Sequence, residues 1–331
     1  MDGLGRRLGT LSVPAIPAGY ENLVNWARGF GPLECAGVEG TGSFGAGLTR
    51  FLRAQGVGVF EVIRPKRSDQ YRSGKSDPID AEAAARSVLA GTATPQPKDA
   101  DGEVEMIPTL RITRRSALKA RAQAANQIQA LLLTAPEGLK SALCELSTAR
   151  LIEKASRLRP GATPSDVEEA TKFALRSMAR RYQHLSEEIG KLDEQLNRVV
   201  SELAPELVAV EGIGTDTAAS LLIAVGDNPE RLKSEAAFAH LCEAAPIPAS
   251  SGKTVRHRLN RHGNRDANRA LYVIAICRMS RDKRTRAYVE RRTKEGKSKK
   301  EIIRCLKRYI AREVYRILAS LSLNKPPLPV P

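Results

Sequence analysis

Three carboxylates in the first quarter of the chain have the residue types and spacing of a metal site. Glu39 ends an apolar stretch that we expect to be a buried strand, and Asp77 and Asp80 stand three positions apart at an expected helix start. Carboxylates brought together repel one another unless a cation lies between them, and such oxygen ligands suit Mg²⁺. Metal ions held in this way serve phosphodiester chemistry. Each aspartate alone could instead be a helix N-cap or a first-turn charge, so both interpretations stay open.

A second candidate site is the stretch PIPASSGKTVRHRLNRHGNR, residues 246–265. Its Gly-Lys-Thr suggests a nucleotide-phosphate loop, but Ile247 stands where that motif needs a glycine, so the motif is excluded. A serine hydroxyl can attack a phosphodiester if its proton is removed and cations meet the developing charge. The alternative, which the residues alone favour, is a turn serine beside a basic loop that contacts nucleic acid. The cations are Lys253, Arg256, His257, Arg258, Arg261, His262 and Arg265.

The net charge of the 331-residue chain is concentrated in one segment. Residues 253–316 contain 22 Lys or Arg and 6 Asp or Glu, a surplus of 16 that equals the net charge of the whole chain. A charge surplus confined to one segment is typical of a protein that binds a polyanion, and nucleic acid is the expected partner. The segment lacks the aromatic apolar face of a helix that lies on a membrane.

The first ninety residues alternate between strand-like and helix-like stretches, which predicts an α/β domain. The helix at 77–91 should have Asp77 at its N-cap and Pro78 at its first position. The stretch GTGSFGAG follows a strand, but no dinucleotide-binding glycine register fits it. We expect strands at 7–15, 33–40 and 57–63, and helices at 18–30, 43–56 and 77–91.

The middle of the chain reads as helical after a linker rich in proline and charge. Eight apolar residues repeat at alternating spacings of four and three, which predicts a coiled-coil arm that ends at Pro205. Its partner is either residues 110–133 of the same chain or another subunit. The seam consists of Met178, Tyr182, Leu185, Ile189, Leu192, Leu196, Val199 and Leu203.

The last third begins with LVAVEGIGTDTAASLLIAVG, which has the form of a helix-hairpin-helix. Gly212 and Gly214 would let the backbone approach a phosphate, although a purely structural turn is as good an interpretation from the residues alone. Basic helices should follow at 267–280 and 298–321. The expected domains are residues 1–95, 105–204 and 205–320, with a proline-rich tail at 321–331.

Cysteine usage and hydropathy indicate a cytoplasmic protein. The five cysteines are scattered and form no C-x-x-C pair, which argues against a zinc site or a disulfide framework. No apolar run approaches membrane-spanning length, and the N-terminus has no signal-peptide pattern.

Five motifs, taken together and in order, resemble the DEDD insertion-sequence transposases, which are described as bridge-RNA-guided recombinases. They are GVEGTGSFG, SDPIDAEAAAR, VEGIGTDTAASLL, PIPASSGKTVRHRLNRHGNRDANRALY and EGKSKKEIIRCLKRYIAREVY. The resemblance implies a RuvC-like N-terminal domain of ribonuclease-H fold, a coiled-coil arm, and a mostly helical C-terminal transposase domain with a serine nucleophile. It also implies donor and target DNA, a structured guide RNA, assembly into dimers or tetramers, and a place at the bacterial nucleoid.

Matched by position, Glu39, Asp77 and Asp80 correspond to three of the family's four acidic residues, and Ser251 corresponds to the nucleophile, with Ser250 as the fallback. The family's first acidic residue lies on a strand upstream of the stretch that begins this chain, and Asp2 does not take its place. We therefore expect an N-terminally truncated chain with an incomplete RuvC-like domain.

The leading hypothesis is a transposase that forms a covalent serine–DNA link beside a Mg²⁺-binding acidic cluster. Nucleic acid would be held by the turn at Gly212 and Gly214 and by five cations, Lys253, Arg256, Arg258, Arg261 and Arg265. One alternative is a metal-dependent junction nuclease that forms no covalent intermediate. The other is a non-catalytic nucleic-acid-binding remnant.

Overall fold

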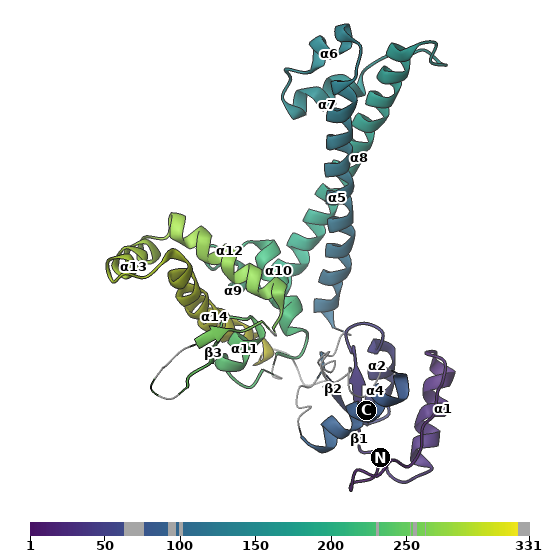
Figure 1. Ribbon diagram of the computed structural model, residues 1–331, viewed down its shortest axis with the longest axis vertical. Helices are drawn as coiled ribbons and strands as arrows, with labels where there is room; N and C mark the ends of the chain where they lie inside the picture. Colours follow the sequence, from purple (N-terminus) through teal and green to yellow (C-terminus); the bar gives the residue numbers. More distant parts are fainter. Residues whose placement is uncertain are drawn as a thin grey trace. The chain divides into compact units, whose positions relative to one another are not determined.

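The computed structural model describes residues 1–62, 76–91, 97–98, 102–229, 232–251, 253, 257–261 and 263–323 (Figure 1). The chain divides into two compact units. One comprises Met1–Glu105 with Ala224–Pro331, and the other comprises Met106–Ile223. Of the predicted features, the tail after residue 323, Gly252, Arg256 and His262 lie outside the described residues.

The N-terminal part of the first unit contains a β-α-β element. Strands β1 (Cys35–Glu39) and β2 (Gly58–Val62) pair in parallel, so the chain between them must cross over, and α2 (Ala46–Ala54) makes this crossing. Helix α1 (Pro17–Arg28) begins with a proline, which presets the backbone of its first turn. The buried core side chains are Val24, Val38, Leu52, Val57 and Val59.

Helix α4 (Asp77–Leu89) packs on β1, and a glycine makes this close approach possible. A Cβ atom at Gly37 would lie 2.9 Å from the Ala84 carbonyl oxygen and 2.9 Å from a methyl group of Val88. The contact joins the middle of β1 to the second half of α4.

Two details of the sequence prediction are wrong in this part. Residues 7–15 form no strand, because the only strands that the described residues place in this sheet are β1 and β2, and an extended segment without a pairing partner is not a strand. The N-cap of α4 is Ser76, and Asp77 is the first helical residue. The other five predicted elements are confirmed.

The second unit is built on two long helices, α5 (Met106–Leu133) and α8 (Val167–Leu203), which lie side by side (Figure 1). Asp166 caps α8 by accepting a hydrogen bond from the Glu169 amide at 2.8 Å. Two short helices join the long ones, α6 (Glu137–Leu143) and α7 (Thr148–Ser156). Their shared core includes Ile128, Leu132, Leu139, Leu143, Leu151, Ile152, Leu175 and Ala179.

The predicted seam of α8 corresponds only in part to its buried side. Ile189, Leu196 and Val199 are buried, whereas Leu175, Ala179 and Val200 are buried without belonging to the seam. The packing partner is α5 of the same chain, which was one of the two predicted alternatives. Additional burial near the start of α8 comes from α7, which also packs on it.

Short helix α9 (Pro205–Val208) follows α8, and α10 (Thr215–Val225) leads into the first unit. The C-terminal part of that unit contains α11 (Glu235–Leu241), β3 (Pro246–Pro248), β4 (His257–Leu259), α12 (Arg265–Arg281), α13 (Lys283–Lys294) and α14 (Lys299–Leu323). Helix α14 packs on α11 and α12. Buried side chains of this part include Phe238, Leu271, Ile274, Ile302, Ile310 and Val314. No helix in the described ranges is long and apolar enough to cross a membrane.

Candidate nucleic-acid interface

The three predicted carboxylates lie on two elements that pack together. Glu39 is the last residue of β1 and is half-buried, while Asp77 and Asp80 occupy the first turn of α4. Their oxygen donors suit Mg²⁺ in type. However, the described part of the chain contains no group of three or more His, Cys, Asp or Glu side chains with a geometry that could hold a metal ion. The structure therefore places these carboxylates on two elements in contact, and it forms no three-residue metal-binding group from the described side chains.

Asp2 is held in a local turn. Its carboxylate accepts hydrogen bonds from the backbone amides of Arg6 at 2.9 Å and Leu4 at 3.0 Å, and it pairs with the Arg6 side chain at 2.6 Å. The bond from the Arg6 amide is the largest cause that lowers the pKa of Asp2. Asp2 thus has a structural role at the start of the chain.

The turn after Glu39 exposes an aromatic residue. Gly40 has φ +66°, and its carbonyl oxygen accepts a hydrogen bond from the Gly45 amide at 3.0 Å, which closes the turn. Phe44 at the tip of this turn is 99% exposed. Sequence reasoning missed this residue, although the glycines around it were a signal that a tight turn would expose the side chain between them.

The serine stretch is part of a hairpin. Strands β3 and β4 pair antiparallel, with Ile247 opposite Arg258, and Ser250 and Ser251 follow β3. Both serines are exposed to solvent. The hairpin thus presents the predicted nucleophile and its fallback on an accessible segment.

The base of the hairpin is fixed to the end of α11. The Asn260 side-chain amide donates to the His240 carbonyl oxygen at 2.8 Å, and the Asn264 backbone amide donates to the Leu241 carbonyl oxygen at 2.6 Å. A Cβ atom at Gly263 would lie 2.3 Å from the same Leu241 oxygen, so only glycine fits there. Asn264 also caps α12 by accepting from the Ala267 amide at 2.9 Å.

Four of the five predicted basic contacts are described, and all four are exposed: Lys253, Arg258, Arg261 and Arg265. Arg258 lies on β4, and Arg265 is the first residue of α12. Their exposure on and around one hairpin suits contacts with phosphate groups.

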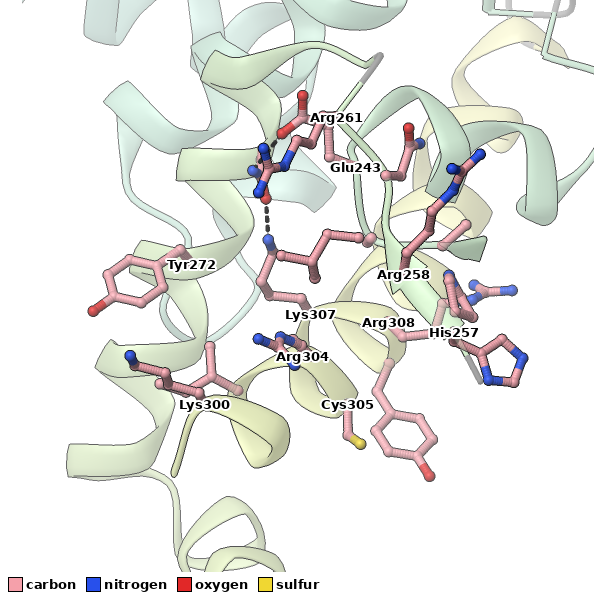
Figure 2. Close-up of a pocket in the computed structure, with 18 of the residues that line it drawn as sticks. Glu243, His257, Arg258, Arg261, Tyr272, Lys300, Arg304, Cys305, Lys307 and Arg308 are labelled. Carbon is pink, nitrogen blue, oxygen red and sulfur yellow. Dashed lines mark hydrogen bonds between the residues drawn. The ribbon is translucent and has the colours of Figure 1, made fainter. Parts of the chain in front are cut away.

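A cavity of about 660 Å³ adjoins this hairpin, and its lining comes from β4, α12, α14 and the segment after α11. Figure 2 shows Lys300, Arg304 and Lys307 on α14, with His257 and Arg258 on the hairpin. Sequence reasoning recognised the basic segment but could not detect this cavity, since its walls come from separate elements.

Lys307 is a half-buried cation of this cavity. Its ammonium donates a hydrogen bond to the side-chain oxygen of Asn268, whose amide donates to Glu243 at 2.6 Å. Burial lowers the pKa of Lys307, although the nearby Glu243 carboxylate acts in the opposite direction. The neighbouring Cys242 is buried, which raises the pKa of its thiol to about 12, so this thiol is protonated at neutral pH.

The predicted helix-hairpin-helix has a short first helix, the four residues of α9. Gly212 has φ +81°, as a tight turn before α10 requires. Asp216 in the first turn of α10 pairs with Arg111 of α5 at 3.0 Å. This pair offsets a carboxylate that would otherwise repel phosphate from the start of the helix.

The structure thus combines a β-α-β element bearing carboxylates with a basic helical region that presents an exposed serine. Two family models identify it more closely. Residues 1–135 match a DEDD model of the IS110 type described as "Transposase", and residues 204–290 match "Transposase IS116/IS110/IS902 family". The chain belongs to the DEDD insertion-sequence transposase family.

Two curated relatives are similar to parts of the chain. The "Insertion element IS110 uncharacterized 43.6 kDa protein" of Streptomyces coelicolor is 32% identical over 125 residues, which cover 37% of this chain and 31% of that protein. The "Transposase for insertion sequence element IS1328" of Yersinia enterocolitica is 27% identical over 218 residues, which cover 63% of this chain and 60% of that protein. The matched parts therefore span less than two thirds of either relative.

Proposed function

We propose that this chain acts as a transposase, a DNA recombinase of an insertion sequence, with Ser251 as its nucleophile. The observation that carries the proposal is the exposed serine on a hairpin surrounded by exposed cations, in a chain of this family. The base of this hairpin is fixed to the end of α11 by the hydrogen bond from Asn260 to His240. The Ser251 hydroxyl would attack a DNA phosphorus, forming a serine–phosphate ester while the bond to the leaving sugar oxygen breaks. The proton passes to solvent or to that oxygen. Attack by the hydroxyl of another strand would then rejoin DNA and release the serine.

The cations around the hairpin have two roles in this proposal. Lys253, Arg258 and Arg261 would hold the phosphates on either side of the attacked bond and stabilise the charge that develops on its oxygens. Arg256 and Arg265 would extend the same contact, and the turn at Gly212 and Gly214 would hold a further stretch of backbone.

The carboxylates would act together with the serine site. Glu39, Asp77 and Asp80 would hold Mg²⁺, which would supply Lewis-acid stabilisation of a phosphodiester. The same proposal includes a RuvC-like arrangement of this region, a guide RNA and a homo-oligomer, for which the family is the support. It also includes a coiled-coil arm, which the packing of α5 on α8 supports.

Covalent trapping tests the nucleophile. Incubation with donor DNA, followed by denaturation, should give a protein–DNA adduct that Ser251→Ala abolishes and Ser250→Ala retains. Ser250 is the matched control because it is a neighbouring exposed serine on the same hairpin. Adducts that persist in both variants would show that neither serine is the nucleophile.

The same experiment separates the two alternatives. A junction nuclease would cleave DNA with Mg²⁺ and give no adduct in any variant. A binding remnant would bind DNA without cleavage under any metal.

A further inference from the structure

The cavity beside the serine hairpin has both apolar and cationic walls. Pro246, Leu259 and Ile303 contribute apolar surface, and Tyr272 and Tyr309 line it while remaining 48% and 52% exposed. A volume of about 660 Å³ lies within the usual range of small-molecule sites, roughly 300–1,000 Å³. It has room for one nucleotide, whereas a double helix could only lie across its opening.

The charges of the lining favour an anionic guest. Lys307 is bonded to Asn268, and Arg308 and Arg312 pair with Glu235, so these three cations are already engaged within the protein. The single carboxylate in the lining, Glu243, accepts the Asn268 amide at 2.6 Å. Within the described part of the chain, four further lining cations form no ion pair: Arg258, Arg261, Lys300 and Arg304.

We propose that this cavity receives a single nucleotide lifted out of the base stack, with its phosphate on Lys300 and Arg304 and its base against Tyr272 or Tyr309. This inference rests on the proposed function, because the hairpin that carries Ser251 also forms a wall of the cavity through His257 and Arg258. Proteins that act on nucleic acids hold an extruded base by stacking it on aromatic or apolar side chains. A nucleotide seated here would anchor the strand beside the serine.

The nucleotide can come from DNA or from RNA, since both carry the same phosphate and an aromatic base. The probes are therefore short single-stranded DNA and RNA oligonucleotides with a single 5-iodouracil, which crosslinks to a stacked aromatic side chain on irradiation. With residues 1–331 of the protein, the crosslink should map to Tyr272 or Tyr309. The oligonucleotide that gives the crosslink, DNA or RNA, identifies the source of the nucleotide.

Affinity measurements on variants complete the test. Tyr272→Ala and Tyr309→Ala are measured separately. The variant that removes the tyrosine holding the base should weaken binding by about 5- to 100-fold, as expected for loss of base stacking. Tyr309→Phe keeps the ring and should bind normally, which controls for the packing of Tyr309 on Tyr288, whose ring centroid lies 5.7 Å away. Phe173→Ala, an exposed aromatic on α8, should have no effect.

The outcomes are distinct from those of the adduct assay. If both oligonucleotides bind but crosslink elsewhere, and neither tyrosine variant changes the affinity, the cavity does not hold a base and the inference is wrong, even if Ser251 adducts form. If crosslinks map to Tyr272 or Tyr309 while no adduct forms on any DNA, the nucleotide site stands and the serine mechanism fails.

Discussion

At the scale of single residues, Lys307 links the cavity to the stability of the fold. It is a partly buried cation that bonds to Asn268, and the groups that affect its titration are Glu243, Cys242 and Arg304. Burial disfavours the charged form and lowers its pKa, whereas the same lysine in the unfolded chain titrates at its usual value. The unfolded state therefore binds more protons between the two pKa values, and stability should rise with pH across that window.

Lys307→Met tests this linkage. At pH 7 the variant should melt at a higher temperature than the parent, because it removes a charged group from a partly buried place. The difference should shrink as the pH rises through the lowered folded pKa toward the ordinary lysine value of about 10.5, above which the lysine is neutral in both states. Thermal melts at both pH values measure it. Lys300→Met, on an exposed part of the same helix, is the control, and a difference that stays constant with pH would contradict the argument.

At the scale of elements, the packing of α4 on β1 joins the two elements that carry the predicted carboxylates. This packing depends on Gly37, where a Cβ atom would also lie 3.0 Å from a methyl group of Val62. The contact atoms include the Ala84 carbonyl oxygen, part of a helix backbone that cannot turn aside as a flexible side chain can. Any side chain at this position must therefore move α4 or β1.

Gly37→Ala should loosen α4. We expect the free energy of local opening to fall by about 1–3 kcal/mol, the usual cost of overpacking, with faster hydrogen–deuterium exchange in α4 and β1. Gly42→Ala is the matched control, because its Cβ would meet no atom within 4 Å and its backbone does not need a positive φ. Equal exchange in the two variants would show that the close approach is not tight.

At the scale of the whole molecule, the charge distribution should govern affinity for nucleic acid. The entire surplus of 16 positive charges lies in residues 253–316, whereas the rest of the chain is balanced. Binding through phosphates releases counterions, so affinity should fall steeply with salt concentration.

Replacing Lys253, Arg258 and Arg261 together by alanine should weaken DNA binding and reduce the slope of log K against log salt by about 2–3 units. Binding titrations at several salt concentrations measure this slope. The control replaces three exposed cations of the second unit, Arg150, Lys154 and Arg159, and changes the net charge equally. Equal slopes in both triple variants would mean that net charge, and not the hairpin, determines binding.

The sequence by itself determined the features that depend on local pattern. Hydrophobic periodicity and helix-start signals predicted β1, β2, α2 and α4, and the placement of charge predicted a polyanion partner. The motifs identified the family from their order along the chain. Local pattern failed at residues 7–15, because a strand requires a neighbouring strand, which the segment's own residues cannot supply.

Only the tertiary structure decided how distant residues meet. It selected α5 of the same chain as a packing partner for α8, and it placed α4 on β1 through Gly37. It also formed the cavity from His257, Tyr272 and Lys307, which are far apart along the chain and lie on β4, α12 and α14. The physical reason is that a cavity, like a buried contact, depends on distances in space, and sequence spacing determines such distances only within a single helix or strand.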